Sequence, residues 1–244
     1  MNTVEILGVK IHCASRDEIL AQTILWAGQP QPRTVFYVNA HCLNNSAIDP
    51  AYREILNQGD LVYPDGISIV WASRWLGGCP LEKVTGRIWI DEFCRLAAEN
   101  GFKIYILAGK PGVARAAQKN LEQRHPQIQI VAARDGFFLE MDEDAILQEI
   151  DQTKPDILFV GMGTPSQEKW LAQNRQSISS PLCWGVGALF DVVAGEEDPV
   201  PAWLDRLALE WLWRLVHDPL GKWRRVVIGF PEFVIRLIIS RLRV

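Results

Sequence analysis

The chain has 244 residues, of which 48% are hydrophobic and 22% are charged. This is the composition of a globular protein, so it excludes a disordered chain and a collagen-like repeat. It contains no uninterrupted apolar run of the length needed for an ordinary membrane-spanning helix. The first five residues lack a basic flank and an apolar run, so we expect no signal peptide.

The five cysteines are odd in number and scattered along the chain, without the spacing of a zinc site. We therefore expect reduced, mostly buried thiols in a cytosolic protein rather than a framework of disulfides. The residues concerned are Cys13, Cys42, Cys79, Cys94 and Cys183.

The net charge of −4 is unevenly distributed. Residues 214–244 contain seven Lys and Arg against two acidic residues, a local charge of +5, which leaves −9 on residues 1–213. The acidic body argues against a dedicated nucleic-acid-binding protein. The basic, apolar tail predicts a partner of its own, different from that of the body.

In chain order, six short runs rich in Val, Ile, Leu or aromatic residues are predicted strands: 34–38, 61–63, 103–107, 128–132, 157–161 and 182–186. Amphipathic segments between them are predicted helices: 16–26, 51–57, 90–99, 112–125, 143–152 and 166–176. Strands that alternate with helices of this length indicate crossover connections and a mainly parallel sheet. The sequence therefore predicts an α/β domain, doubly wound and Rossmann-like, over residues 1–195.

Gly195, Pro199 and Pro201 mark the predicted boundary of this domain. Residues 196–244 then form a helical, basic C-terminal appendage, with a helix over 203–216, breaks at Pro219, Gly221 and Pro231, and a final helix to the end of the chain.

The final helix is amphipathic. Its polar stripe is Glu232, Arg236, Ser240 and Arg243, and its apolar side holds Phe233, Val234, Leu237, Ile238 and Leu242. Such a helix fits the surface of an anionic membrane, which it is too short to span. An ordinary helix packed on the core explains the same pattern, and the Trp and Leu residues of the tail also fit an interface between copies of the chain.

Ligands of open α/β sheets bind beyond the carboxyl ends of the strands, so the residues that follow each predicted strand are candidate site residues. Glycines recur there and allow a ligand phosphate to approach the backbone. The segments are 39–41, 64–66, 108–112, 135–137, 161–165 and 187–191, with Gly66, Gly109, Gly136, Phe137, Gly161, Gly163 and Asp191 among the candidates for substrate binding. Several such turns in phase indicate a nucleotide site, although each one alone is weak evidence.

Two known signatures are absent or explained otherwise. Gly161-Met162-Gly163 lacks the third glycine of a dinucleotide fingerprint, because Ser166 occupies that position, and the chain has no Walker-type phosphate loop. Asp142-Glu143-Asp144 matches the Asp-x-Asp pattern of metal-dependent sugar-nucleotide enzymes. It precedes a predicted helix, however, where capping and the helix dipole account for acidic residues, so we expect no metal site.

Asp65 is the best candidate for a catalytic carboxylate. It follows an apolar strand and a proline, where a general base for a sugar hydroxyl fits as well as a cap of the next helix. His41 fits a base or ligand, but a lone histidine near the core is more often a hydrogen-bonded structural residue. Gln167 and Glu168 fit ligand binding or helix capping, and for Asp191 both roles also remain open.

Six motifs along the chain resemble those of one protein family. They are residues 38–41 (VNAH), 60–66 (DLVYPDG), 83–86 (KVTG), 155–170 (PDILFVGMGTPSQEKW), 185–191 (GVGALFD) and 209–215 (LEWLWRL). In this order they are similar to the WecG/TagA/CpsF family of bacterial glycosyltransferases, also called glycosyltransferase family 26, and they extend over nearly the whole chain.

The resemblance implies an activity. Such enzymes transfer N-acetylmannosamine, or its uronic acid, from a UDP-sugar to N-acetylglucosamine on diphospho-undecaprenol. The reaction inverts the anomeric centre, is expected to need no metal or other cofactor, and feeds teichoic acid, common antigen or capsule polysaccharide synthesis. It places the protein in the cytoplasm, peripherally on the inner face of the plasma membrane, with the tail on the anionic lipid surface.

The resemblance also implies roles for single residues. Asp65 corresponds to the proposed base, and Asn39, Gln167 and the turn at Gly161–Gly163 to nucleotide-side residues. The basic appendage completes the site, which maps onto Arg214, Lys222, Arg224 and Arg225. Without a metal, the leaving diphosphate needs such cations and backbone N–H groups, and Lys83, Arg87, Lys110 and Lys169 are the few cations near the strand ends of the body.

Two residues depart from the family pattern. Tyr37 stands where many members have threonine, and Lys83 stands where many have arginine. A lysine keeps the charge but loses bidentate phosphate geometry. Both differences concern the identity of the donor sugar rather than the class of reaction.

Two other functions fit parts of the sequence. A non-catalytic scaffold that recruits polysaccharide enzymes to the membrane would use the tail and not the candidate base. A nucleotide-dependent oxidoreductase would use the sheet, and the missing dinucleotide fingerprint counts against it.

Overall fold

The computed structural model describes residues 1–196, 200–201, 204 and 210–242. At its centre is a six-stranded parallel sheet in the order β4-β3-β8-β7-β5-β6. The strands are β3 (Arg33–Val38), β4 (Leu61–Pro64), β5 (Lys103–Ala108), β6 (Gln129–Arg134), β7 (Ile157–Gly161) and β8 (Leu182–Gly185). All six predicted strands are confirmed, with small shifts of their ends. β7 and β8 are buried throughout, as expected for central parallel strands.

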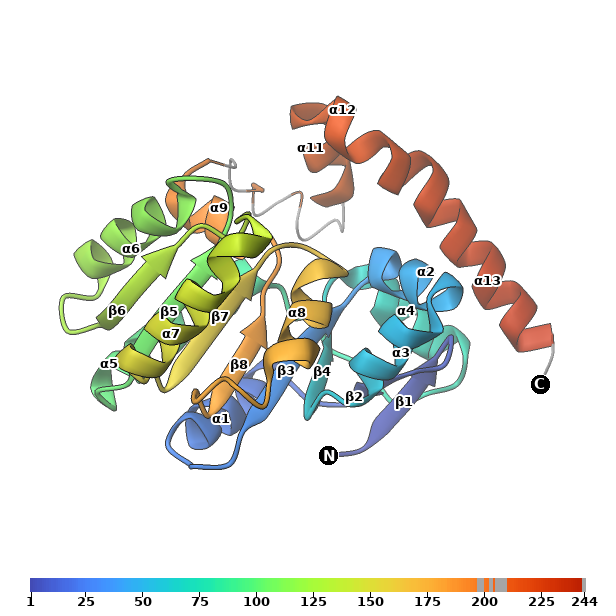
Figure 1. Ribbon diagram of the computed structural model, residues 1–244. Helices are drawn as coiled ribbons and strands as arrows, with labels where there is room; N and C mark the ends of the chain where they lie inside the picture. The colour runs from blue at the N-terminus through green and yellow to red at the C-terminus, as the bar shows by residue number, and fades with distance from the viewer. Residues whose placement is uncertain (197–199, 202–203, 205–209, 243–244) are drawn as a thin grey trace.

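Helices cover both faces of the sheet (Figure 1). One core contains buried side chains of α1 (Arg16–Ala27), α5 (Gly86–Glu99), α6 (Val113–Arg124) and α9 (Leu189–Ala194). The other contains side chains of α2 (Ala40–Ile48), α3 (Pro50–Asn57), α4 (Ile67–Trp75), α7 (Glu143–Thr153), α8 (Ser166–Asn174) and α13 (Phe230–Leu242). A 3-10 turn, Glu140–Asp142, precedes α7. The doubly wound α/β fold is therefore confirmed.

The first core is centred on stacked tryptophans. The rings of Trp89 and Trp184 lie 4.2 Å apart and nearly parallel, and Phe93 packs edge-on against Trp184. Trp89, Phe93 and Trp184 are all buried. Aromatic pairs of this kind add stability beyond the area that they bury, so they fix α5 against β8.

The N-terminal hairpin and α2 are among the elements that the sequence did not predict. β1 (Thr3–Ile6) and β2 (Val9–His12) form an antiparallel hairpin whose alternate residues enter the second core. Its two-residue turn, Leu7-Gly8, has positive φ at both positions, as hairpin turns of this length require. α2 lacks a strong apolar stripe in its sequence, and its start is fixed by the Asn39 cap.

The cysteine prediction is wrong for two of the five residues. Cys13, just after β2, and Cys79, in the loop after α4, form a disulfide. They are 66 residues apart in the chain, so their spacing gave no signal. Cys42, Cys94 and Cys183 are free and buried, as predicted.

The C-terminal part is helical, as predicted, but its helices are not interrupted at all of the predicted positions. α11 (Glu210–His217) overlaps the predicted helix over 203–216, of which residues 203 and 205–209 lie outside the described part of the chain. α12 (Pro219–Trp223), a π-helical segment (Arg224–Gly229) and α13 then follow without interruption. The predicted breaks at Gly221 and Pro231 are therefore wrong. The wider π turn just before Pro231 accommodates a residue that lacks an N–H donor.

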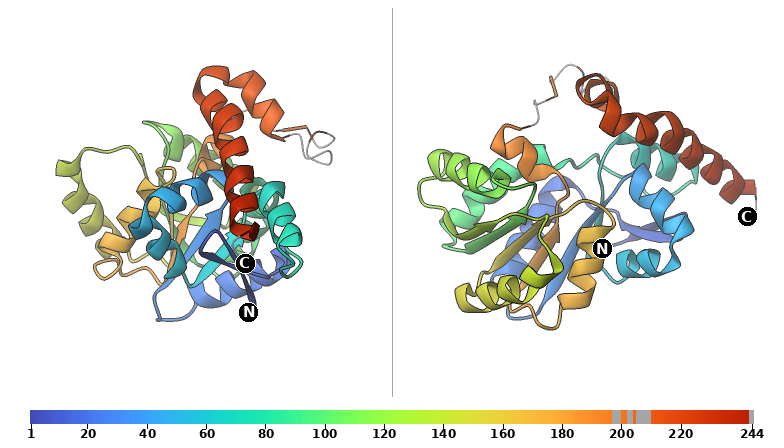
Figure 2. Two further views of the ribbon diagram at one scale, coloured as in Figure 1. Left: turned by 90° about the vertical axis from the view of Figure 1, so that its right-hand side faces the viewer. Right: turned by 45° about the horizontal axis from the view of Figure 1, so that its top comes forward.

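The two views in Figure 2 and the view in Figure 1 place α11 and α12 above the carboxyl edge of the sheet, and α13 beside α2. Phe233 and Leu237 of α13 are buried in the second core. Val234, Ile235, Ile238 and Ile239 of the same helix are exposed. Within the described residues, the structure contains no helix of the length and apolarity that crossing a bilayer requires.

Candidate active site

The candidate site lies where connections leave the sheet in opposite directions. α8 follows β7 into the second core, whereas α6 follows the adjacent β5, and α9 the adjacent β8, into the first. Such a switch leaves a crevice beyond the carboxyl ends of the strands, where α/β proteins bind their ligands. The segments that follow β3, β4, β7 and β8 all begin at this crevice.

Asp65 and Asn39 meet across the ends of β4 and β3. Nδ2 of Asn39 lies 3.3 Å from Oδ2 of Asp65 and donates to it. The backbone N–H of Asp65 donates to the carbonyl of Val38, at 2.8 Å, which fixes the chain beyond the strand. Asp65 immediately precedes Gly66, the N-cap residue of α4. The predicted pair of base and nucleotide-side residue is thus a direct contact.

Asn39 is almost fully buried and also caps α2. Its Oδ1 accepts from the backbone N–H groups of His41 and Cys42, at 3.1 and 3.2 Å. Because that oxygen is engaged by the helix, the amide nitrogen is directed at Asp65. The cap therefore sets the orientation of the group that contacts the candidate base.

A second hydrogen-bonded group joins the ends of β7 and β8. Oε1 of Gln167 accepts from the backbone N–H of Gly187 at 2.8 Å, and Nε2 of Gln167 donates to Oε1 of Glu168 at 2.8 Å. The hydroxyl of Thr164 donates to the same oxygen of Glu168, also at 2.8 Å. Gln167 and Glu168 are both fully buried. Neither serves simply as an exposed helix cap.

Cys42 connects the two groups. Its Sγ donates to Oδ1 of Asn39 at 3.4 Å and lies 3.7 Å from Oγ1 of Thr164. Contacts therefore run from Asp65 through Asn39, Cys42 and Thr164 to Glu168. They tie together residues from the carboxyl ends of β4, β3 and β7.

Burial dominates the electrostatics of this cluster. It raises the pKa of Glu168 to about 7, although the hydrogen bonds from Gln167 and Thr164 favour the charged form. Burial also raises the pKa of Cys42 to about 12, and it raises that of Tyr37 well above its ordinary range. These thiol and phenol groups are therefore neutral at physiological pH.

His41 lies on α2, below the C-terminal helices. Burial, with a smaller contribution from the positive charge of Arg225, lowers the pKa of His41 to about 4. Nδ2 of Asn45 lies 3.4 Å from Nε2 of His41. A histidine that is neutral near pH 7 and partly buried fits the structural role left open by the sequence.

The strand-end glycines allow close backbone contact. Gly109 N–H donates to the carbonyl of Gly161, and Gly136 N–H donates to the carbonyl of Gly109. A Cβ at Gly161 would lie 2.6 Å from the carbonyl oxygen of Gly187, so no larger residue fits without displacement. Phe137, which follows Gly136, is exposed.

Other predicted residues lie around this edge. Lys83 is in the segment whose Val84 N–H donates to the carbonyl of Pro64, next to Asp65. Gly163 forms the turn that leads into α8, with positive φ. Asp191 is in the first turn of α9, which packs in the opposite core from α8.

The predicted cations of the appendage are described only in part. The side chains of Arg214 and Lys222 lie outside the described part of the structure. Arg224 is exposed, and its guanidinium lies over the ring of Trp223, 5.5 Å from the centroid. Arg225 is the appendage residue whose charge acts on His41 and Cys42.

No cluster of three or more His, Cys, Asp or Glu with the arrangement of a metal site occurs among the described residues. Asp142 is the N-cap residue of α7, but its side chain makes no capping hydrogen bond, so the capping part of the interpretation is wrong. Glu143 and Asp144 lie in the first turn of the helix, where the helix dipole favours acidic residues. Oε1 of Glu143 accepts from Nδ2 of Asn174 at 2.8 Å.

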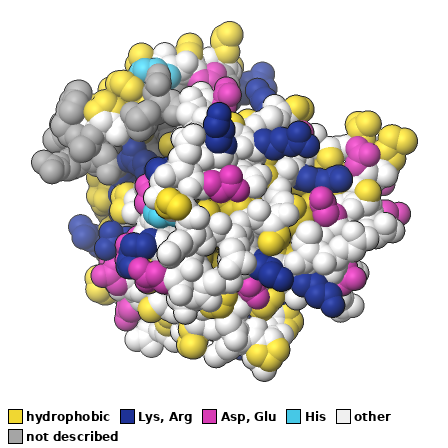
Figure 3. Space-filling view, turned by 90° about the vertical axis from the view of Figure 1, so that its left-hand side faces the viewer, with side chains coloured by type: hydrophobic (Ala, Val, Ile, Leu, Met, Phe, Trp, Pro, Cys, Tyr) yellow, Lys and Arg dark blue, Asp and Glu magenta, His cyan; other side chains and the backbone are white. Residues whose placement is uncertain are grey.

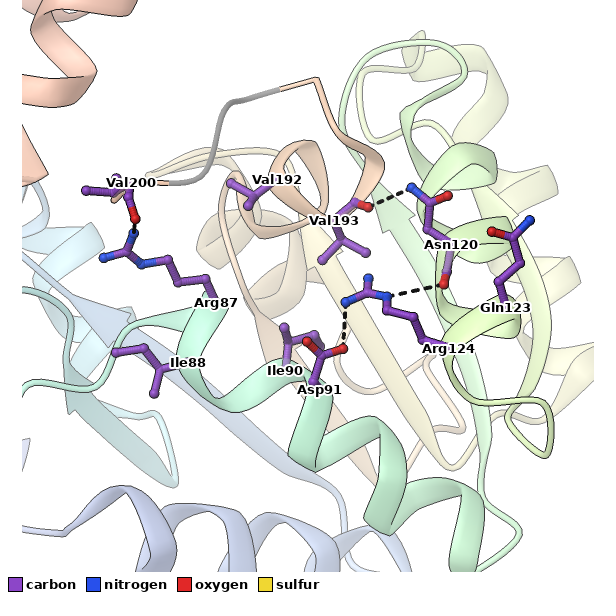
Figure 4. Close-up of a pocket in the computed structure, with 10 residues that line it drawn as sticks. All are labelled: Arg87, Ile88, Ile90, Asp91, Asn120, Gln123, Arg124, Val192, Val193 and Val200. Atoms are coloured by element: carbon purple, nitrogen blue, oxygen red, sulfur yellow. Dashed lines mark hydrogen bonds and ion pairs between the residues drawn. The ribbon is translucent and has the colours of Figure 1, made fainter. Parts of the chain in front are cut away.

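A cavity of about 600 Å³ lies elsewhere, among α5, α6 and α9 (Figure 4). In it Arg124 pairs with Asp91 at 2.6 Å, and Asn120 Nδ2 donates to the carbonyl of Val193 at 2.9 Å. It contains none of the residues of the Asp65 group. On the face shown in Figure 3, basic and acidic side chains are interspersed rather than gathered by sign.

Sequence reasoning missed two members of the cluster and gave a third other roles. Thr164 and Cys42 were not singled out, and Glu168 was considered only as a ligand contact or cap. Thr164 precedes the predicted helix over 166–176, and Glu168 lies in the first turn of α8, so no rule of helical spacing joined these two residues. The role of Cys42 depends on contacts between distant segments.

Comparison with known proteins agrees with the motifs. The profile of the "Glycosyl transferase WecG/TagA/CpsF family" matches residues 4–244. N-acetylglucosaminyldiphosphoundecaprenol N-acetyl-beta-D-mannosaminyltransferases of Staphylococcus aureus strains MRSA252, MW2 and NCTC 8325 are each 28% identical to this chain over 238 residues. The matches cover 96% of this chain and 91% of each relative. Both the strand-end cluster and this match support the same conclusion: the chain belongs to the WecG/TagA/CpsF family of glycosyltransferases.

Proposed function

We propose that the protein is an inverting glycosyltransferase that moves N-acetylmannosamine, or a related N-acetylhexosamine or its uronic acid, from a UDP-sugar to N-acetylglucosamine-diphospho-undecaprenol. The observation that carries the proposal is the contact of Asp65 with the helix-capping Asn39 at the carboxyl edge of the sheet. The names of the Staphylococcus aureus relatives support the choice of sugar and acceptor. The product would feed cell-surface polysaccharide or teichoic acid synthesis.

Asp65 acts as the general base. Its carboxylate removes the proton from the acceptor hydroxyl as that oxygen attacks the anomeric carbon, and the bond from that carbon to the UDP oxygen breaks. Attack from the face opposite the leaving diphosphate inverts the anomeric centre. General bases of this kind contribute about 10²–10⁴-fold to the rate. The amide of Asn39 supports this role by holding one carboxylate oxygen, Oδ2.

The donor binds at the switch point beside the base. Gln167 and the backbone of the turns at Gly161, Gly163, Gly109 and Gly136 form its nucleotide side. Gly66, Phe137 and Asp191 surround this edge as further contacts. Lys83 and the appendage cations Arg214, Lys222 and Arg224 balance the charge of the departing diphosphate, a role in which fixed cations and N–H donors lower the barrier.

The appendage, residues 196–244, meets the membrane, and residues 1–195 form the glycosyltransferase domain. Ile235 and Ile239 are exposed on the outer side of α13, beside a shallow groove of about 580 Å³. Arg241 lies over the exposed Trp75, 4.7 Å from its ring centroid, which adds a cation and an aromatic ring to the same region. Basic residues next to apolar ones favour an anionic bilayer. These features support a peripheral position on the inner face of the plasma membrane.

Vesicle co-sedimentation tests the membrane surface. Ile235→Glu with Ile239→Glu should abolish binding to vesicles that contain anionic phosphatidylglycerol, while the same changes leave the melting temperature unaltered. Leu25→Glu with Ile48→Glu, exposed on α1 and at the end of α2, is the matched control and should bind as the wild type does. If the α13 variant binds fully, the tail surface instead serves another partner, such as a second copy of the chain, which sedimentation velocity would detect.

The donor panel tests the reaction itself. The full chain in detergent is incubated with individual UDP-sugars and a lipid-diphospho-N-acetylglucosamine acceptor, and the lipid product is identified by mass spectrometry. One UDP-sugar should add a single N-acetylhexosamine unit or its uronic acid. Failure with every donor, using folded protein and an acceptor that a known enzyme accepts, would favour a non-catalytic scaffold.

A further inference from the structure

We propose that Glu168 is a positioning residue of the donor site. Through Thr164 and Gln167 it holds the turns that follow β7 and β8, and it takes up a proton from solvent when the diphosphate of the donor binds. This inference rests on the proposed function and adds a residue, and a pH dependence, to its donor site.

Geometry makes Glu168 the centre of its hydrogen-bonded group. One carboxylate oxygen, Oε1, accepts from both Thr164 and Gln167 at 2.8 Å. Gln167 is held from its other end by the N–H of Gly187. Because an amide has distinct donor and acceptor ends, the acceptor at Glu168 fixes which way Gln167 faces. The orientation of a nucleotide-side residue therefore depends on Glu168.

The second oxygen of Glu168 is in an unusual position. Oε2 is buried and, among the described residues, has no hydrogen-bond partner. An ionised carboxylate with one unpartnered oxygen in a buried place is unfavourable, whereas the neutral acid carries its proton there. Burial accordingly raises the pKa of Glu168 to about 7. The group is thus close to the point at which a nearby charge decides its protonation.

The surroundings of Glu168 offer little positive charge. Tyr37 of β3, Cys42 of α2 and Tyr52 of α3 all have their pKa raised in part by the negative charge of Glu168, so they face it as neutral groups. Lys169, the next residue of α8, is paired with Asp49 at 2.7 Å. Arg225, from the π-helical segment, acts on Cys42, and Asp65 of the β4 end adds negative charge near Tyr37.

The donor changes this balance in one direction. Its diphosphate brings negative charge to the turns that Glu168 supports, and like charges disfavour the ionised form of a carboxyl group. Glu168 is therefore more readily protonated with donor bound than without it. By linkage, donor affinity must fall as the pH rises through about 7, because more of the free protein is then ionised.

Calorimetry of UDP-N-acetylmannosamine binding, without acceptor, tests this in the full chain. The diphosphate diester of a UDP-sugar does not titrate near neutrality, so any pH dependence belongs to the protein. The wild type should bind about fivefold more weakly at about pH 8.5 than at about pH 6, with proton uptake that shows as a dependence of the heat on the buffer.

Three variants complete the test. Glu168→Gln, which keeps an acceptor oxygen without a titration, should bind equally at both pH values and take up no proton. Thr164→Val removes a bond that favours the ionised form, so the weakening should begin at higher pH than in the wild type. Glu122→Gln, on the exposed side of α6, is the control and should retain the wild-type pH profile.

The outcomes separate the two claims. If Glu168→Gln keeps the wild-type pH dependence, or if the wild type shows none, the role of Glu168 is wrong while donor binding stands. A uniform loss at both pH values in both cluster variants would also reduce Glu168 to a structural residue. If the wild type binds none of the UDP-sugars of the donor panel, the proposed function itself fails and the role of Glu168 falls with it.

Discussion

Asn39 directs its amide nitrogen at the carboxylate of Asp65, 3.3 Å away, while its carbonyl oxygen caps α2. One side chain thus joins the start of a helix to the candidate base. The arrangement explains why an asparagine suits this place: it supplies an acceptor for the helix and a donor for the carboxylate at once.

Asp65→Asn should lower the rate of sugar transfer at least about 100-fold, because the amide cannot accept the proton of the acceptor hydroxyl. The side chain keeps its size, so the melting temperature should stay close to that of the wild type. Asp156→Asn, far from this edge at the amino end of β7, is a control for a general effect of losing a carboxylate. Transfer by Asp65→Asn at a near wild-type rate would exclude Asp65 as the base.

Asn39→Asp separates the two roles of Asn39. Aspartate caps helices about as well as asparagine, so the free energy of unfolding should change little, whereas Asn39→Ala should lose about 1 kcal/mol with the cap. Both variants lose the donor to Asp65, and Asn39→Asp also places a second carboxylate beside it. Transfer should therefore fall most in the more stable variant. Chemical denaturation and steady-state kinetics on the same samples measure both effects, and parallel changes in the two would contradict the assignment.

Gly187→Ala should destabilise the fold by about 1–3 kcal/mol. Gly187 has a φ of +59°, and an added Cβ would lie 2.5 Å from Oη of Tyr37. Removing that oxygen with Tyr37→Phe should recover part of the loss, giving a coupling of about 1 kcal/mol between the two positions in a double-mutant cycle. Additive effects would show that the backbone strain alone, and not Tyr37, limits residue 187 to glycine.

The lowered pKa of His41 predicts that the protein loses stability in acid. Its pKa in the folded protein is about 4, below the ordinary value of 6.5. The unfolded chain therefore binds the proton first as the pH falls from 6.5, and stability decreases until the pH passes about 4. Glu168, whose pKa is raised, has the opposite dependence over part of this range. The contribution of His41 is therefore measured as the difference in stability between the wild type and a variant that lacks this histidine.

The free energy of unfolding of wild type and His41→Gln should be compared across this range. The wild type should lose about 1–3 kcal/mol more than the variant between neutral pH and the acid end. Equal pH dependence in the two proteins would mean that His41 is accessible enough to be protonated while the protein is folded.

Much of the architecture could be predicted because it depends on local pattern. The runs that became β5 and β7 are short and apolar and end at glycines, so both the parallel sheet and the edge that carries Asp65, Asn39 and Gln167 follow from the sequence. The resemblance to known glycosyltransferases supplied the role of Asp65. Composition alone indicated neither the role of Asp65 as the base nor the identity of the donor sugar.

The rest depends on contacts between distant segments. Cys13 and Cys79 meet only because the hairpin packs beside the loop after α4. The continuous helix over 219–242 needs a π turn before Pro231, and no local pattern in the sequence announces one. The burial of Glu168 likewise arises from α2, α3 and β3 closing around α8. Sequence rules describe single helices and strands, whereas each of these features depends on how one element meets the next or packs against another.

The most direct test of the account is acceptor-dependent release of UDP by the wild type and by Asp65→Asn, in the same detergent and with UDP-N-acetylmannosamine as donor. We expect rapid release by the wild type only when lipid-diphospho-N-acetylglucosamine is present, and a loss of at least about 100-fold in the variant with donor binding intact. Equal acceptor-dependent release by both proteins would contradict the central claim that Asp65 is the base of this glycosyltransferase.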